Sequence, residues 1–480
     1  MHCHRYSDLN GMTRREVITR MGQGVGGAAL ASLLGTPQTA EARGIAGLPH
    51  FAPKAKRVIC LFMSGGLSQL ESFDYKPVLA QQAGKPVPPS VFKGRKPLGM
   101  SKLQGNFFAQ GSVFPFKQHG QSGAWVSDMF PQIARHSDRI CFLKGMVSDA
   151  VNHDPAIIFA NSGAQLPGRP VMGSWLSYGL GSENENLPAF IVLVTRKPVD
   201  QPLSSRLWDS GFLPSQHQGV PFRAGKEPVL FLENPTGLPP ELHRKMLDRL
   251  RELHQDELAR RGEAEINARI EQYEMAFRMQ TSVPDVTSIA DEKKATLERY
   301  GPDAEKSGSF ARNCILARRL SERGVRFVQL YHPGWDHHAN IKGGFEGTAK
   351  EIDQPIAALL DDLNERDMLK DTLVMFMTEF GRTCYSQGGS VKGDADYGRE
   401  HHRDAFTFWL AGAGIKGGVS HGVTDDFGFD VVEGKVTMND FHATFMHLMG
   451  IQHDRFTFPF QGRDFRLTDI AGNVVKPILA

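Results

Sequence analysis

Val325-Arg326-Phe327-Val328-Gln329-Leu330 and the eight residues that follow, Tyr331-His332-Pro333-Gly334-Trp335-Asp336-His337-His338, decide how this chain is interpreted. The first run is apolar and typical of a β-strand, and the second brings together one carboxylate and three imidazoles. A strand end that presents Asp and His side chains is suited to a divalent metal ion. Alternate residues of an extended segment share a face, so Asp336 and His338 are expected to bind one ion. His337 is a further candidate metal ligand, and both His337 and His332 are candidates for a position next to the site.

Two further clusters have the same chemistry, Thr378-Glu379-Phe380-Gly381-Arg382 and Gly398-Arg399-Glu400-His401-His402. Glu379 follows a very apolar run, where a charge is costly unless it is paired or bound to metal. A salt bridge from Glu379 to Arg382 is the alternative. His401 and His402 follow a polar loop and would otherwise be an exposed pair. Taken together, the clusters predict a metal site with Glu379, His401 and His402 as additional ligands.

Carboxylate and imidazole ligands leave the ion open among zinc, manganese, calcium and iron. Such an ion would polarise a phosphoryl or sulfuryl oxygen or activate a water molecule. Arg382, Arg399 and Arg403 are suited to hold the anionic oxygens of a tetrahedral ester. Each arginine has a purely structural role as its alternative.

The composition is that of an ordinary soluble globular protein. The chain has 480 residues, of which 40% are hydrophobic and 22% charged, with a formal net charge of +2. This length is sufficient for one large core or two domains. The near-neutral charge implies no large basic face for nucleic acid. Five cysteines occur without a CxxC pair, which argues against a zinc–thiolate site.

The first 42 residues are expected to be a targeting segment. Thr13-Arg14-Arg15-Glu16-Val17-Ile18 has the twin-arginine pattern, and a short, weakly apolar stretch follows at 22–35. Ala40-Glu41-Ala42 is a plausible cleavage site. We therefore expect a twin-arginine signal peptide at 1–42, a mature domain at 43–480, and a periplasmic or secreted location. No stable membrane span is expected after cleavage. The alternative is a basic amphipathic helix at the N-terminus.

Strand-like and helix-like segments alternate along the mature chain, which predicts an α/β fold with a largely parallel sheet. Ligands of such folds bind beyond the C-terminal ends of the strands, where the clusters after 325–330 and 372–377 lie. Residues 239–323 are predicted to be a mostly helical insertion that caps the sheet or helps oligomerisation. The expected strands are at 57–63, 139–143, 188–194, 229–232, 325–330, 372–377 and 405–410, and the other expected helices are near 129–136, 352–365 and 439–448.

Several separated motifs resemble the bacterial family catalogued as domain of unknown function 1501, and more distantly the alkaline phosphatase/sulfatase superfamily. The motifs are Gly65-Gly66-Leu67-Ser68-Gln69, Phe73-Asp74-Tyr75-Lys76-Pro77, 169–176, 178–181, Gly334-Trp335-Asp336-His337-His338, Glu379-Phe380-Gly381-Arg382-Thr383, Gly462-Arg463-Asp464 and Leu467-Thr468-Asp469. The resemblance implies an alkaline phosphatase-like three-layer α/β/α sandwich with metals at the strand ends. It implies that Asp336 and His338 are the superfamily's Asp…His metal pair, Glu379 a carboxylate ligand and His401 the last metal histidine.

The chain departs from the superfamily in two places. Its first strand ends in Met63-Ser64-Gly65-Gly66 instead of acidic ligands, for which Glu71 or Asp74 are possible substitutes. His153 stands where the nucleophile of sulfatases lies, so it is a candidate metal ligand, general acid or nucleophile. Ser64 is the hydroxyl alternative for catalysis, and Ser68 is a candidate for substrate binding. Because Pro155 suits the first turn of a helix, His153 or Asp154 is also expected at an anion-favouring helix N-terminus, with an ordinary Asp N-cap as the alternative.

These observations predict an exported metal-dependent hydrolase of phosphate or sulfate esters. Its substrate would be an anionic ester, such as a sulfated or phosphorylated saccharide. The alternative is a non-catalytic metal- or anion-binding protein on the same scaffold, because the first-strand acids and the standard nucleophile are missing. A secreted structural protein without metal is the third reading.

Overall fold

The computed structural model describes residues 44–196, 203–225, 228–229, 232–234, 237–262, 264–389 and 396–480. The expected signal peptide at 1–42 lies outside the described residues. Residues 230 and 231 of the strand expected at 229–232 also lie outside them. The strand that follows β5 (Phe190–Val194) along the chain is β6 (Val220–Phe222), and the two strands pair with each other.

Within the described residues, nine strands form one central sheet in the order β12-β4-β11-β8-β1-β7-β5-β6, with β15 beside β4. All neighbouring strands in it are parallel except for the two pairs made by β11. The predicted α/β class with a largely parallel sheet is therefore confirmed. The remaining strands of this sheet are β1 (Arg57–Ser64), β4 (Ile140–Val147), β7 (Phe327–Pro333), β8 (Thr372–Met377), β11 (Phe406–Ala411), β12 (Val419–His421) and β15 (Val436–Thr437).

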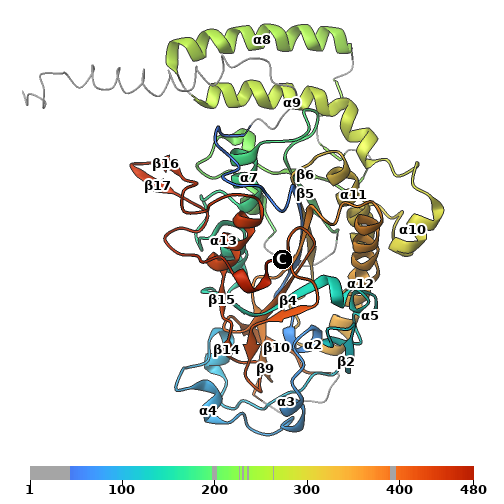
Figure 1. The fold of residues 1–480 in the computed structure, drawn as a ribbon, viewed down its shortest axis with the longest axis vertical. Helices are drawn as coiled ribbons and strands as arrows, with labels where there is room; N and C mark the ends of the chain where they lie inside the picture. Colours follow the sequence, from blue (N-terminus) through green and yellow to red (C-terminus); the bar gives the residue numbers. More distant parts are fainter. Residues whose placement is uncertain are drawn as a thin grey trace, which may run out of the picture.

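Side-chain alternation along the strands builds two cores, one on each face of the sheet. In β1, Ile59 and Leu61 belong to one core, whereas Cys60 and Phe62 belong to the other. A strand that is buried on both faces must be apolar throughout, which explains the unbroken run in β1. The helices α11 (Phe310–Glu322) and α12 (Ile341–Glu365) contribute to the first core, and α6 (His153–Ser162), α7 (Met172–Leu180) and α13 (Met438–Leu448) to the second. Figure 1 shows α11 and α12 on the right and α7 and α13 on the left, which gives three layers.

The segment at 239–323 contains α8 (Pro240–Arg261), α9 (Ala264–Thr287), α10 (Lys294–Tyr300) and α11. Gly262 ends α8 in the left-handed conformation, with φ +68°. The helices α8 and α9 lie together at one end of the long axis, far from α4 (Pro89–Phe92) at the other end (Figure 1). No helix in the described part of the chain is both long enough and apolar enough to cross a bilayer.

The turn after β1 packs against the turn after β7 at the C-terminal edge of the sheet. Gly65 has φ +121°, and a Cβ added there would lie 2.7 Å from the backbone nitrogens of both Trp335 and Asp336. The backbone of Trp335 in turn donates to the carbonyl of Ser64, at 3.2 Å. Glycine is thus required at Gly65 for its conformation and for the close approach of two chain segments. This contact fixes Asp336 above the end of β1.

We expect Gly65→Ala to lower the thermal midpoint of unfolding far more than Gly47→Ala does. Gly47 also has a positive φ, of +87°, but an added Cβ would meet nothing within 4 Å. Gly47→Ala therefore measures the backbone cost alone, about 1–2 kcal/mol. Equal midpoints for the two variants would show that the turns after β1 and β7 can separate freely.

Candidate metal centre

Four side chains from three parts of the chain meet at the C-terminal edge of the sheet. His153 begins α6, Asp336 and His338 lie in the turn after β7, and His401 lies in β10 (Arg399–His402). One potential ligand atom from each lies within 4.8 Å of all the others. The side chains keep between 11% and 33% of their surface exposed, so the cluster is open to solvent.

The carboxylate of Asp336 is the centre of this cluster. Its Oδ1 lies 2.8 Å from Nε2 of His338 and 3.2 Å from Nε2 of His401, and its Oδ2 lies 3.1 Å from Nε2 of His153. The Nε2 atoms of His338 and His401 are themselves 3.1 Å apart. Three imidazole nitrogens therefore face one carboxylate.

Each of the three imidazoles is held from behind through its other nitrogen. Nδ1 of His153 faces Oε1 of Glu379 at 2.7 Å, and Nδ1 of His401 faces the carbonyl of Val151 at 2.8 Å. Nδ1 of His338 faces the side-chain oxygen of Gln387. An acceptor at Nδ1 selects the Nδ1–H tautomer and leaves the lone pair on Nε2, which is the usual arrangement of metal-binding histidines.

Nε2 of His153 supplies a test of whether a metal ion fits this site. The atom is buried and makes no hydrogen bond, although it lies 3.1 Å from Oδ2 of Asp336. Buried polar atoms without a partner are rare in folded proteins. A cation at the centre of the cluster would give Nε2 of His153 a partner and would separate the two facing nitrogens of His338 and His401. The residues present therefore fit a metal ion.

The electrostatics of the cluster follow from burial and from its two carboxylates. Burial opposes the protonation of His153, but Asp336 and Glu379 outweigh it and raise the pKa of His153 to about 9. Burial also disfavours the ionised form of Asp336, yet the three facing histidines and the charge of Arg382 hold its pKa well below its usual range. Burial lowers the pKa of His401 to about 4.

Glu379 lies behind His153 rather than within the cluster. It is fully buried at the end of β8, and its Oε1 accepts hydrogen bonds from His153 and from the backbone nitrogen of Gly65 at 2.8 Å. The hydroxyl of Thr378 donates to its other oxygen at 3.3 Å. The sequence predicted that a charge at Glu379 would need a partner, and in the structure hydrogen bonds stabilise this buried carboxylate. A direct bond from Glu379 to metal stays a prediction.

His402 and His337 are not brought into the cluster. His402 follows His401 in β10 and points to the other face, where its Nε2 donates to the carbonyl of Phe429 at 2.6 Å. The ring of His337 packs beside Trp335 and Phe345. Asp336 and His338 therefore lie in the cluster and His337 does not, and metal binding by His337 and His402 stays a prediction.

The two arginines expected to bind substrate are buried and engaged with carboxylates. Arg382 donates to Oδ1 of Asp336 at 2.6 Å and to the carbonyl of Gly66 at 2.8 Å. Arg399 pairs with the fully buried Glu71, with a shortest distance of 2.7 Å. In this arrangement both guanidinium groups position other residues. Arg403 keeps 36% of its side chain exposed.

The predicted hydroxyl candidates are buried too. Ser68 donates to Glu71, and Ser64 is fully buried at the end of β1. Glu71 pairs with Arg399 and Asp74 with Lys76 at 3.2 Å, and neither acid belongs to the four-residue cluster. The catalytic role of Ser64 and the substrate contact of Ser68 stay predictions.

Sequence reasoning missed Gln387, the carbonyl of Val151 and Gly398. Gln387 directly follows β9 (Gly381–Ser386), which pairs with β10, so a predicted β9–β10 hairpin would have placed it opposite Gly398, just before β10. A Cβ added at Gly398 would lie 2.0 Å from the carbonyl carbon of His338. The glycine that opens the third motif is thus the position where the hairpin packs against the turn that holds Asp336 and His338. Nothing in the sequence identifies a backbone carbonyl such as that of Val151.

We expect Asp336→Ala and His401→Ala to lose bound metal, because each removes one of the converging atoms. His402→Gln is the matched control, since it changes the adjacent histidine on the opposite face of β10. Elemental analysis of the purified variants measures the metal-to-protein ratio. Unchanged metal in Asp336→Ala, or equal loss in His402→Gln, would contradict this assignment.

We also expect metal affinity to rise with pH up to about 9, because His153 is protonated below its pKa and must release that proton to bind an ion. The expected slope is about tenfold per pH unit. Titration against a chromophoric chelator measures it. Glu379→Gln removes one of the two carboxylates that raise this pKa, so its affinity should level off at lower pH. A flat profile in the unaltered protein would exclude His153 as a ligand.

Comparison with known proteins gives a family but no established activity. No curated protein matches the chain. Matching solved structures include the sulfatase PsFucS1 from Pseudoalteromonas sp. (10% identity, TM-score 0.36, 89% of this chain and 72% of that chain) and the lipoteichoic acid synthase LtaP from Listeria monocytogenes (10%, 0.36, 91% and 79%). A mutant of TAB5 alkaline phosphatase with bound Mg also matches (12%, 0.32, 77% and 94%). TM-scores of this size carry no argument about function. The family model described as "Protein of unknown function (DUF1501)" matches residues 55–479, and the chain belongs to this family.

Proposed function

We propose that the protein is an exported, metal-dependent hydrolase of phosphate or sulfate esters. The observation that carries this proposal is the convergence of three Nε2 atoms on the Asp336 carboxylate at a solvent-open strand edge. Residues held in this way from behind are pre-organised for one ion. The twin-arginine pattern of the sequence supports export, since that route carries proteins that are already folded.

The donor set favours zinc among the ions considered. Three imidazole nitrogens and one carboxylate form a four-ligand set of the kind zinc takes, whereas calcium takes six to eight oxygens. Manganese and iron are compatible with the same ligands. The ion, when bound, would polarise an ester oxygen and lower the pKa of a water molecule.

The charge of the site supports an anionic substrate. Asp336 and Glu379 contribute two carboxylates, and Arg382 already offsets one of them through its contact with Asp336. With a divalent ion the site would therefore be positive overall, which attracts anionic esters to a cleft edge. Arg403 donates to the carbonyl of Asp149, in the loop before α6, and is the partly exposed cation we assign to the ester oxygens.

His153 acts in this proposal as a ligand rather than as a nucleophile. Its Nδ1–H is committed to Glu379, and its Nε2 faces the cluster. When the pKa is near 9, the free imidazole holds two protons at neutral pH and has no lone pair for attack. When Nε2 binds an ion instead of a proton, its lone pair is used in that bond and is likewise not free to attack. We therefore assign the attack on phosphorus or sulfur to water, with the alcohol as leaving group.

The burial of the predicted serines and arginines favours the alternative, a non-catalytic metal-binding protein. Ser64, Ser68, Arg382 and Arg399 each have no more than 1% of their surface exposed. A standard nucleophile and a fixed anion clamp are therefore not presented to solvent by these four residues. Measured turnover decides between the two functions.

We expect the zinc-loaded protein to hydrolyse p-nitrophenyl phosphate or p-nitrophenyl sulfate with release of p-nitrophenol. His338→Ala should abolish turnover, and Glu379→Gln should lower it about 10- to 100-fold by loosening His153. His402→Gln is the matched control and should stay near the unaltered rate. Stoichiometric bound metal without turnover on phosphate, phosphonate and sulfate esters would refute the hydrolase and support the binding protein.

A further inference from the structure

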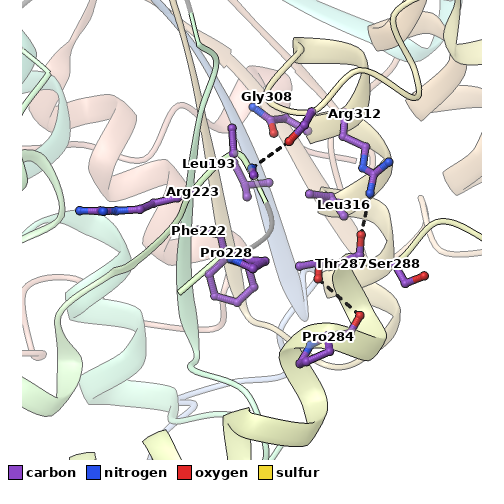
Figure 2. A pocket seen from close by; sticks show the side chains of 14 residues that line it. Leu193, Phe222, Arg223, Pro228, Pro284, Thr287, Ser288, Gly308, Arg312 and Leu316 are labelled. Carbon is purple, nitrogen blue, oxygen red and sulfur yellow. Dashed lines mark hydrogen bonds between the residues drawn. The ribbon is translucent and has the colours of Figure 1, made fainter. Parts of the chain in front are cut away.

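A cavity of about 270 Å³ lies away from the residues of the metal centre. It opens beside the C-terminal ends of β5 and β6, between the end of α9 and the first turns of α11 (Figure 2). None of the four clustered metal-centre residues lines it. The cavity is therefore distinct from the candidate metal centre.

One side of the cavity is apolar. Leu193 at the end of β5 and Phe222 at the end of β6 are buried, as is Leu316 of α11. Pro228 and Pro284 complete this side (Figure 2). Such a surface accommodates hydrocarbon and offers no hydrogen bonds from side chains.

The other side presents a cation that has no carboxylate partner. The Arg312 guanidinium donates to the carbonyl of Thr287 at 2.8 Å, as Figure 2 shows, and makes no ion pair within the described residues. Burial and the neighbouring Arg319 lower the pKa of Arg312, and Glu305 only partly opposes them. A half-buried arginine usually pairs with an acid, so Arg312 is available to an anion from outside the chain.

Asn313 provides an independent indication of a ligand. This residue lines the cavity, is only 5% exposed, and its Nδ2 is buried without a hydrogen-bond partner. A buried donor that lacks a partner is rare, and here a ligand acceptor would satisfy it. Arg312 thus has a backbone acceptor but no carboxylate partner, and the neighbouring Asn313 has no acceptor for its Nδ2.

The wider electrostatic setting also favours an anion. The cavity lies at the N-terminus of the 13-residue helix α11, where the helix dipole is positive. None of the residues that line it is Asp or Glu. Its volume approaches the lower end of small-molecule sites, which leaves room for an apolar body beside the anionic group.

We propose that this cavity binds a small organic anion. Its charged head, a carboxylate, phosphonate or phosphate, contacts Arg312 and Nδ2 of Asn313, and its apolar body packs against Leu193 and Phe222. The site is separate from the metal centre and does not depend on the hydrolase activity proposed above.

Phenylphosphonate is a suitable probe, because it has both parts and no ester bond to hydrolyse. We expect saturable binding to the metal-loaded full-length protein by isothermal titration calorimetry, and much weaker binding of neutral benzyl alcohol. Asn313→Asp keeps the shape of the side chain but places a negative charge in the cavity, so it should weaken binding at least about tenfold. Arg312→Met should weaken it similarly, and Arg312→Lys should restore part of the affinity.

Asp336→Ala distinguishes phenylphosphonate binding in this cavity from binding at the candidate metal centre. Binding in the cavity should be retained in that variant. Because Arg312 also supports the end of α9, the thermal midpoint of each variant is measured alongside. If Arg312→Met is unfolded, the nearly isosteric Asn313→Asp decides the question. Binding that persists in Asn313→Asp, disappears in Asp336→Ala, or fails to saturate at millimolar phenylphosphonate overturns the proposal.

Discussion

The fully buried carboxylate of Glu379 positions His153 of the candidate metal centre and joins three segments at the edge of the sheet. A charge at the end of an apolar strand is tolerated only when its oxygens are bound by donors. Here the donors come from the turn after β1, through Gly65, and from the start of α6, through His153. The hydrogen bonds of this one residue, which lies just after β8, therefore hold two other segments at the same edge of the sheet. The orientation of His153 depends directly on it.

A buried ion pair between Arg399 and Glu71 stabilises the outer part of the same sheet edge. Arg399 of β10 and Glu71 are both fully buried and bind each other, while Arg382 of β9 reaches across to Asp336 and Gly66. Each of these guanidinium groups spans two chain segments. The β9–β10 hairpin is therefore held against the sheet by charge-assisted hydrogen bonds. His401 gains its position from that anchoring.

Much of the fold was predictable from the sequence, whereas the assignment of roles within the site was less so. The apolar runs at 57–63 and 372–377 indicated strands that the structure shows as β1 and β8, because burial on both faces demands that composition. Side-chain alternation also placed Asp336 and His338 on one side of the turn. Glu379 and His153, by contrast, were recognised as polar residues at strand and helix ends without a means to tell which of them faces the ion. That distinction depends on a contact between residues 226 positions apart.

The ion-pair partners of the arginines could not be predicted from the sequence either. Local spacing cannot reveal that Glu71 is the partner of Arg399, because the two lie 328 positions apart. Arg382 was weighed against Glu379 as a salt-bridge partner three residues away, yet it binds Asp336 from a different strand end. Sequence patterns identified which residues are chemically unusual, and the topology of the sheet decided which of them meet.

The separation of the ligands along the chain has a consequence for resistance to unfolding. An ion held by α6, the β7 turn and β10 would act as a cross-link between segments that are distant in the polypeptide, and would restrict the chain entropy of partly opened states much as a disulfide does. The cysteines of the described residues are all unpaired and buried, so they supply no covalent counterpart. A bound metal would add a further long-range cross-link to the hydrogen bonds and ion pairs that already join these segments.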